Sequence, residues 1–252
     1  MSFHYNHRLP RCVSNYQLDN NTIHLVHSAH KWTPKQIKLV ENITHFFPNH
    51  TINLLVIKDQ FNLNETVKYI PAATLKRVTP RHVQEIKPFA ELQARHPNIH
   101  VTYITYQSIF EKTPLFLNWP YLNEQMKIFA ARVLQMWQFG GLSFDLLEFR
   151  IPQPKRFQNE TDYAERKLKK FLRRGLEKFE KLSPEMVSVD RNGLHMEAKT
   201  PCHAFFDNVF MKLRRAHQKS TPRSVLTGAL YTFCADGVID SDFCQNRNII
   251  LF

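Results

Sequence analysis

The feature that most constrains the fold is an alternation of apolar strands and amphipathic helices in the first half of the chain. A Thr33-Pro34 start, typical of a helix N-terminus, opens a helical pattern over 33–47, and residues 80–95 predict a second helix. Three apolar runs rich in β-branched residues predict strands, at 22–29, 52–59 and 99–105. Strands that alternate with helices pair in parallel, so the sequence predicts an α/β sheet.

Polar residues follow the first predicted strand. In parallel sheets, ligands bind at the carboxyl ends of the strands, so His27 and Ser28 are candidates to face a ligand. A polar strand end without any ligand explains the same two residues equally well. The chain has neither a GxGxxG fingerprint nor a Walker loop, so a nucleotide would have to be held in another way.

The stretch ARVLQMWQFGGLSFDLLEF, residues 131–149, predicts a helix, a glycine pair and a short strand over 143–149. Gly140 and Gly141 end the helix, because glycine accepts the left-handed backbone that a helix exit needs. Asp145 lies in the strand between apolar neighbours, where a carboxylate is costly unless a cation meets it. A metal ion or Arg132 would serve. Spacing alone favours a strand-end carboxylate that bonds to the backbone or to Arg132.

The chain is basic, with a formal net charge of +12. Such a charge suits a nucleic acid, an anionic nucleotide or an acidic membrane surface. Positive residues concentrate at 164–181, where apolar residues also recur at helical spacing, which favours a solvated basic helix face. The sequence has no zinc-finger, RNA-recognition or helix-turn-helix signature, so we predict no nucleic-acid partner. Residues 202–217 predict a further helix.

The cysteines and glycosylation sequons bear on the cellular compartment. The four cysteines fit two disulfides, and they fit four buried thiols equally well. Five N-x-Thr sequons favour the lumen of the secretory pathway; they begin at Asn20, Asn42, Asn49, Asn64 and Asn159. The chain contains no apolar stretch that would span a bilayer and no signal peptide. We therefore expect either a cytosolic protein or the body of a longer protein whose anchor precedes it.

The sequence RVLQMWQFGGLSFD resembles the signature of sugar transferases that carry a DxD motif. The similarity is to the α-1,4-galactosyltransferase family and extends from about Thr22 to the end of the chain. The segments that carry it follow the family's order: HLVHSAH, VENITHFFPNHTINLLVI, RHPNIHVTYITYQSIFEKTPLFLNW, NGLHMEAKTPCHAFFDNVF, SVLTGALYTFC and FCQNRNIILF.

The resemblance implies a GT-A-like nucleotide-sugar-binding fold with a Rossmann-like N-terminal half. One domain would span 22–252, after an N-terminal extension at 1–21 and with a short C-terminal end. The implied reaction moves a galactose or N-acetylhexosamine from a UDP-sugar to a glycolipid or glycoprotein acceptor, with retention of configuration. Mn²⁺ would neutralise the charge on the departing UDP. The family resides in the Golgi membrane, so membrane association would come only from an N-terminal anchor missing from this chain.

The resemblance also assigns site residues. Arg132 matches the arginine that contacts the donor, and Asp145 matches the first acid of DxD. The remaining matches are His27 and Ser28 near the uridine, and Asn192 and Gly193 along the donor pocket. By the same resemblance, Cys234 and Cys244 form a disulfide in a C-terminal loop.

The chain also departs from the family pattern. Leu147 stands where the second acid of DxD belongs, and Glu148 would replace that acid as a metal ligand only if the strand bulges. Phe129 stands where the signature has an aspartate. Two hypotheses follow: an active glycosyltransferase, or a catalytically inactive family member that binds a glycan or a partner enzyme.

Overall fold

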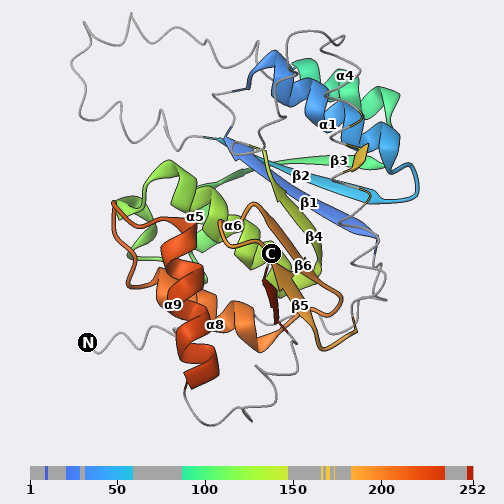
Figure 1. The fold of residues 1–252 in the computed structure, drawn as a ribbon. Helices are drawn as coiled ribbons and strands as arrows, with labels where there is room; N and C mark the ends of the chain where they lie inside the picture. Colours follow the sequence, from blue (N-terminus) through green and yellow to red (C-terminus); the bar gives the residue numbers. More distant parts are fainter. Residues whose placement is uncertain are drawn as a thin grey trace, which may run out of the picture.

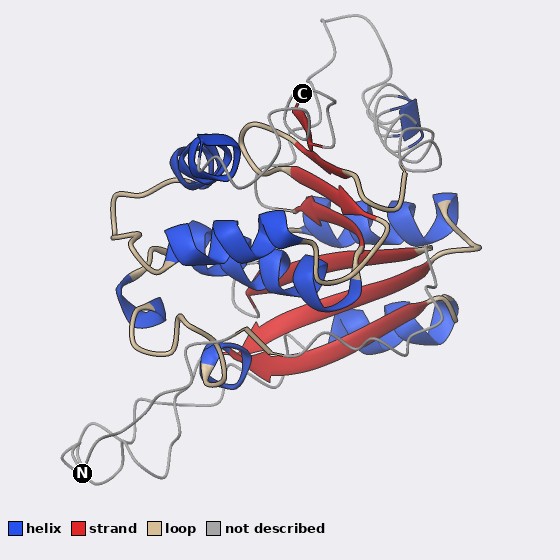
Figure 2. Cartoon of the chain, turned by 90° about the horizontal axis from the view of Figure 1, so that it is seen from below, coloured by secondary structure: helices blue, strands red, loops and turns tan. Residues whose placement is uncertain are grey.

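A computed structural model gives the fold for residues 9–10, 21–28, 32–58, 87–146, 166, 169–170, 173, 183–235 and 249–251. Its centre is a seven-stranded sheet in the order β3-β2-β1-β4-β6-β5-β7. The strands are β1 (Thr22–Ser28), β2 (Thr51–Lys58), β3 (Ile99–Thr105), β4 (Gly141–Asp145), β5 (Val187–Val189), β6 (His195–Ala198) and β7 (Ile249–Leu251). Helices cover both faces of the sheet (Figures 1 and 2).

The first four strands are parallel, in the order β3-β2-β1-β4. This matches the first four strands of the Rossmann order 3-2-1-4-5-6. β4 then pairs antiparallel with β6, β6 pairs antiparallel with β5, and β5 pairs parallel with β7. The prediction of an α/β fold with a Rossmann-like N-terminal half is therefore confirmed.

One face of the sheet is covered by α1 (Pro34–Phe46) and α4 (Lys87–Arg95). α1 begins where the sequence predicts, because Thr33 accepts a hydrogen bond from the Gln36 amide and Gln36 accepts one from the Thr33 amide. The core on this side joins the two helices to β1, β2 and β3; it includes Leu39, Val40, Ile43, Phe89, Leu92, Ile23, Leu54 and Ile99. We call this side the α1/α4 face.

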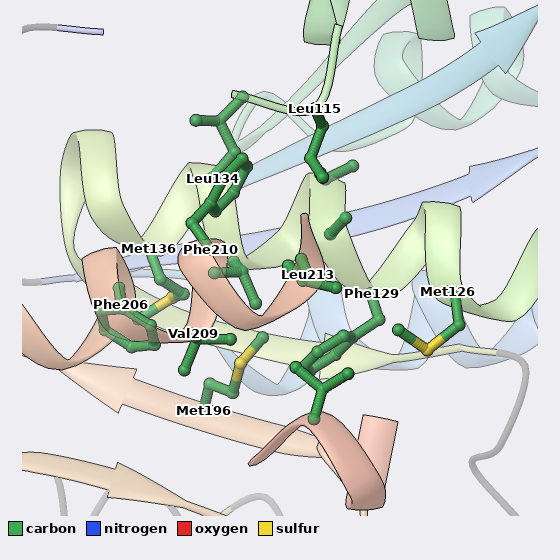
Figure 3. Close-up of a cluster of buried hydrophobic side chains, with 14 of the residues drawn as sticks. Leu115, Met126, Phe129, Leu134, Met136, Met196, Phe206, Val209, Phe210 and Leu213 are labelled. Atoms are coloured by element: carbon green, nitrogen blue, oxygen red, sulfur yellow. The ribbon is translucent and has the colours of Figure 1, made fainter. Parts of the chain in front are cut away.

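The opposite face carries α6 (Glu124–Phe139), α8 (Ala204–Leu213) and α9 (Pro222–Ala235), with α5 (Tyr106–Phe110) following β3 directly. α6 is the centre of a second core, because its buried residues meet both the sheet and α8. Figure 3 shows Phe129 and Met136 of α6 together with Val209 of α8 and Met196 of β6. We call this side the α6 face.

The glycine pair makes the turn from α6 into β4. Gly140 and Gly141 both have positive φ, +66° and +87°. A Cβ added to Gly141 would lie 2.6 Å from the backbone oxygen of Thr22. Glycine is therefore required both for the backbone conformation and for the close approach of β4 to β1, as the sequence predicts.

Several predicted boundaries were wrong. β4 begins at Gly141 and ends at Asp145, so Asp145 is the last strand residue and does not lie inside a strand that runs to 149. The helix predicted to run to 217 ends at Leu213. The sequence did not predict α5, α9, β5, β6 or β7, because these elements are short or lack a clear period. The loop predicted at 150–165 and the start of the helix predicted from Pro80 lie outside the described residues.

Three further expectations concern charge, cysteines and membranes. The described residues of 164–181 are helical and exposed, as a solvated basic face requires; they are Arg166, Lys169, Lys170 and Arg173.

Cys202 is disulfide-bonded, which excludes four buried thiols. The predicted Cys234–Cys244 bond lies outside what the structure describes. Within the described ranges, every helix is too short or too polar to cross a bilayer.

Candidate functional site

Arg132 is the most highly bonded side chain in the candidate site. It projects from α6 toward β4 and is fully buried. A guanidinium has five N–H groups, and here all five donate: to Ser143 Oγ, Ser143 O, Asp145 Oδ2, Gly193 O and Leu194 O, at 2.8–3.1 Å. Arg132 thus ties the end of β4 to the turn between β5 and β6.

Asp145 ends β4 opposite Val26 of β1. Its carboxylate is 2% exposed, and Oδ2 lies 3.1 Å from Nη1 of Arg132. Its backbone amide donates to Leu194 O at 2.8 Å. Burial lowers the pKa of Arg132, and the negative charges of Asp145 and Asp190 oppose that shift. The two buried charges face each other, so each has a counter-charge within the core.

The turn that contains Asn192 and Gly193 connects β5 to β6. Asp190 organises it, because its carboxylate accepts from the amides of Asn192 and Leu194, at 2.7 and 3.2 Å. Gly193 has φ +70°, which suits glycine, and its carbonyl accepts from Arg132. The structure therefore brings Gly193 beside Arg132 and Asp145, while the side chain of Asn192 is exposed.

Phe129 fills the position where the DxD signature has an aspartate. Its side chain is fully buried, and it contacts the turn: a Cβ added to Gly193 would lie 2.7 Å from Phe129 Cε2. The aromatic ring therefore packs in the core between α6 and the β5–β6 turn.

His27 and Ser28 end β1, the neighbour of β4, and both are buried. Side chains alternate along a strand, so these two residues point to opposite faces. His27 lies on the α1/α4 face, with its ring 4.4 Å from that of Trp32, and its Nδ1 accepts from the Ser28 amide at 2.8 Å. Ser28 points to the α6 face, the same face as Asp145. The two residues predicted to sit near the uridine thus do not share one face.

The metal prediction rests on Asp145 and Glu148. Glu148 and Leu147 lie outside the described residues. Among the residues that are described, no three His, Cys, Asp or Glu side chains lie close enough to hold a metal ion. At the end of β4 the described carboxylate is that of Asp145, and its Oδ2 is paired with Arg132.

Sequence reasoning missed a second buried pair, a histidine next to a glutamate. His195 and Glu197 of β6 are 3% and 0% exposed, with His195 Nε2 2.9 Å from Glu197 Oε1. They lie on the α1/α4 face, because β6 pairs Phe144 with His195 and Leu142 with Glu197. The His195 ring stacks on Phe144 at 4.7 Å. The alternating H-x-E pattern after the DRNG turn was the available signal for a strand that carries two polar groups on one face.

Comparisons with known proteins add little beyond this geometry. No family model matches the chain, and no curated protein matches it. One similar solved structure is described as PaToxG glycosyltransferase. It shares 16% sequence identity with a TM-score of 0.49, over 90% of this chain and 72% of that one. A likeness of this size identifies neither a substrate nor a reaction.

Proposed function

We propose that this chain is a glycosyltransferase-like protein that binds a UDP-sugar at the carboxyl ends of β1 and β4. The observation that carries the proposal is the position of Asp145. It ends β4 beside the carboxyl end of β1, where the strand order β3-β2-β1-β4 reverses direction. Open α/β sheets bind their ligands at such a switch point. The DxD resemblance of the sequence leads to the same residue.

The proposed reaction transfers a galactose or N-acetylhexosamine to a glycolipid or glycoprotein acceptor. Arg132 would fix the position of Asp145 and of the β5–β6 turn during this reaction, because all N–H donors of Arg132 are already used within the protein. A Mn²⁺ ion, held by Asp145 with Glu148, would neutralise charge on the departing diphosphate. The donor contact predicted for Arg132 would require it to exchange one of these internal bonds.

A Golgi or other secretory-pathway location also remains a proposal. The Cys202 disulfide is compatible with it, since disulfides persist in oxidising compartments.

A second candidate function is an inactive family member that binds a glycan or a partner enzyme. Two features of the site favour it. Phe129 is a core residue where an acid would meet the sugar, and Asp145 is 2% exposed and already ion-paired. Losing one electrostatic contact to a transition state costs about 3 kcal/mol, a hundredfold or more in rate.

Calorimetry of UDP binding, with and without Mn²⁺, tests whether the site binds a nucleotide. We expect Mn²⁺-dependent binding that is lost in Asp145→Asn, a variant that keeps an oxygen facing Arg132. Asp207→Asn is the matched control, because Asp207 lies on α8 outside the site. Near-ultraviolet circular dichroism would establish that each variant is folded. If UDP fails to bind under both conditions, the nucleotide-sugar proposal is wrong.

A transfer assay then tests catalysis. Radiolabelled UDP-galactose and UDP-N-acetylhexosamines would be supplied with lactose-terminated acceptors. Turnover that Asp145→Asn abolishes supports the transferase. UDP binding without turnover supports the inactive candidate, and turnover that survives in Asp145→Asn contradicts the role given to Asp145.

A further inference from the structure

Two loops meet at the edge of the sheet where the parallel strands end. The first, 111–123, follows α5, which begins directly after β3, and leads into α6. It includes a short 3-10 turn, η2 (Trp119–Tyr121). The second, 214–221, connects α8 to α9. Figure 1 places this second loop beside the segment between α5 and α6. We call the pair the two-loop surface.

Hydrogen bonds hold the two loops together. The Asn118 side-chain amide donates to the carbonyl of Arg214. The Asn123 side-chain amide donates to the carbonyls of Gln218 and Ser220, at 2.8 and 3.1 Å. Within the second loop, the His217 amide donates to Ser220 Oγ at 3.0 Å. The two-loop surface is therefore a formed part of the fold, in which each loop supports the other.

The first loop supplies exposed apolar side chains. Leu117 is 60% exposed and Tyr121 is 74% exposed. They stand beside a partly buried anchor, because Trp119 packs against the α6-face core and Lys127 lies over its ring at 5.6 Å. One loop, fixed at its base, thus exposes both a leucine and a tyrosine.

The second loop supplies positive charge. Arg215, His217 and Lys219 are exposed on it, and Arg223 is exposed in the first turn of α9. From Asn208 to Ala235 the sequence has no aspartate or glutamate, so no acid within this segment offsets these cations. The first loop carries one exposed acid, Glu111, followed by the exposed Lys112. The two-loop surface therefore combines large apolar side chains with a net positive charge.

We propose that the two-loop surface docks on an anionic lipid bilayer. The apolar side chains would enter the boundary between headgroups and acyl chains, while the cations meet lipid phosphates and carboxylates. Leucine favours a bilayer over a nucleic acid, because it offers bases neither a stacking face nor a hydrogen bond. This contact is additional to any N-terminal anchor, and it does not depend on the nucleotide-sugar proposal. It would bring the carboxyl edge of β1 and β4 toward the lipid.

Vesicle flotation tests the inference with the purified chain and vesicles that carry no glycolipid. We expect binding to phosphatidylserine–phosphatidylcholine vesicles, weak binding to pure phosphatidylcholine, and loss of binding when salt rises from about 0.1 to about 1 M. Replacing Leu117→Ser and Tyr121→Ser together should lower the partition coefficient at least about tenfold. Replacing Arg215→Ser and Lys219→Ser should lower it about 30-fold.

Two controls keep the test specific. Tyr231→Ser removes a tyrosine of equal exposure, 76%, from the later part of α9, and should leave binding unchanged. Lys169→Ser with Lys170→Ser removes the same charge from the basic segment 164–181 and should have a smaller effect than the Arg215 and Lys219 pair. Thermal melting would show that the variants fold.

Several results would overturn the inference. Equal binding to neutral vesicles, or apolar variants that bind like the parent, would exclude insertion by Leu117 and Tyr121. A larger effect from the 164–181 control would place the contact on that segment. Binding to a mixed-sequence single-stranded RNA without binding to vesicles would identify a nucleic-acid surface. Because UDP is absent throughout, failure here leaves the proposed function standing, and failure of UDP binding leaves this inference standing.

Discussion

The two faces of the sheet each bury a pair of polar side chains next to β4, and the two pairs are built differently. On the α6 face, Arg132 and Asp145 come from different elements, and the arginine uses every donor. On the α1/α4 face, His195 and Glu197 come from one strand, and Glu197 Oε2 has no hydrogen-bond partner in the described part of the chain. The Ser188 hydroxyl, opposite Glu197, also lacks one there.

The difference shows what each pair does for the fold. Arg132 joins α6, β4 and the β5–β6 turn, so it defines the geometry of the candidate site. The His195–Glu197 pair joins two positions on a strand that the sheet already fixes. We therefore expect the stability of the protein to depend on the Arg132–Asp145 ion pair. Replacement of the His195–Glu197 pair should be tolerated.

The largest expected effect is that of Arg132→Met. This variant leaves Asp145 buried without its cation and should lower the free energy of unfolding by about 3–5 kcal/mol. Arg95→Met is the control, since Arg95 and Glu41 form an exposed ion pair and its loss should cost less than about 1 kcal/mol. Urea denaturation measures both. A cost for Arg132→Met no greater than that for Arg95→Met would refute the role assigned to Arg132.

Acid should lower the free energy of unfolding through His24, which lies on the α6 face and is buried under the Gly140–Gly141 turn. Burial lowers the pKa of His24 to about 4, although the nearby Gly140 backbone opposes the shift. Below about pH 6.5 the unfolded chain takes up a proton that the folded chain takes up only near pH 4. Stability is therefore fully present above pH 6.5 and falls by about 3 kcal/mol as the pH drops to 4.

Denaturation at several pH values tests this expectation. His24→Leu should flatten the pH dependence between 6.5 and 4, whereas the exposed His100→Leu should not. An unchanged slope in His24→Leu would assign the acid sensitivity to other groups.

Gly193→Ala sharpens the comparison at the β5–β6 turn. The added methyl would meet Phe129 at 2.7 Å, at a backbone φ of +70°. We expect a loss of about 2 kcal/mol in the free energy of unfolding. Gly228→Ala is the matched control: it lies in α9 with only Lys212 Cδ nearby at 4.0 Å, and should stabilise the protein by about 0.5 kcal/mol. Equal effects in the two variants would mean that the β5–β6 turn accommodates the added methyl group at little cost.

The smallest effect should come from the α1/α4 face. Glu197→Gln keeps the size of the side chain and should cost about 1 kcal/mol. The double variant His195→Phe with Glu197→Leu should be close to neutral, because an apolar pair replaces a buried polar one. A large loss in the free energy of unfolding of the double variant, measured by urea denaturation, would show that the two faces do not differ in this way.

Much of the fold follows from local sequence patterns. The strands at β1, β2 and β3 are long apolar runs, and α1 has a Thr33-Pro34 start, so each signal lies within one segment. The glycine pair was interpreted correctly, because both residues have positive φ. β5 and β7 have three residues each, too few to show a period, and their pairing depends on partners far away in the sequence.

The candidate site was predicted only in part. The sequence placed Asp145 and Arg132 close enough to pair, and it offered the ion pair as one alternative. It did not indicate that Ser143, Gly193 and Leu194 would take the remaining donors of Arg132. Those acceptors come from two segments about 50 residues apart in the chain. The donor, metal and acceptor assignments stay predictions.

The sequence by itself determined the α/β class, the turn from α6 to β4 and the presence of an acid in β4. Periodicity and glycine placement act within a few residues, so they can be recognised without a structure. Only the tertiary structure decided that Asp145 is buried against Arg132 and that Phe129 packs on Gly193. It alone also decided that the loop carrying Leu117 and Tyr121 is hydrogen-bonded to the 214–221 loop. These contacts join segments that are distant in the chain. Burial and electrostatic interactions depend on which segments meet in space, so local sequence patterns do not reveal them.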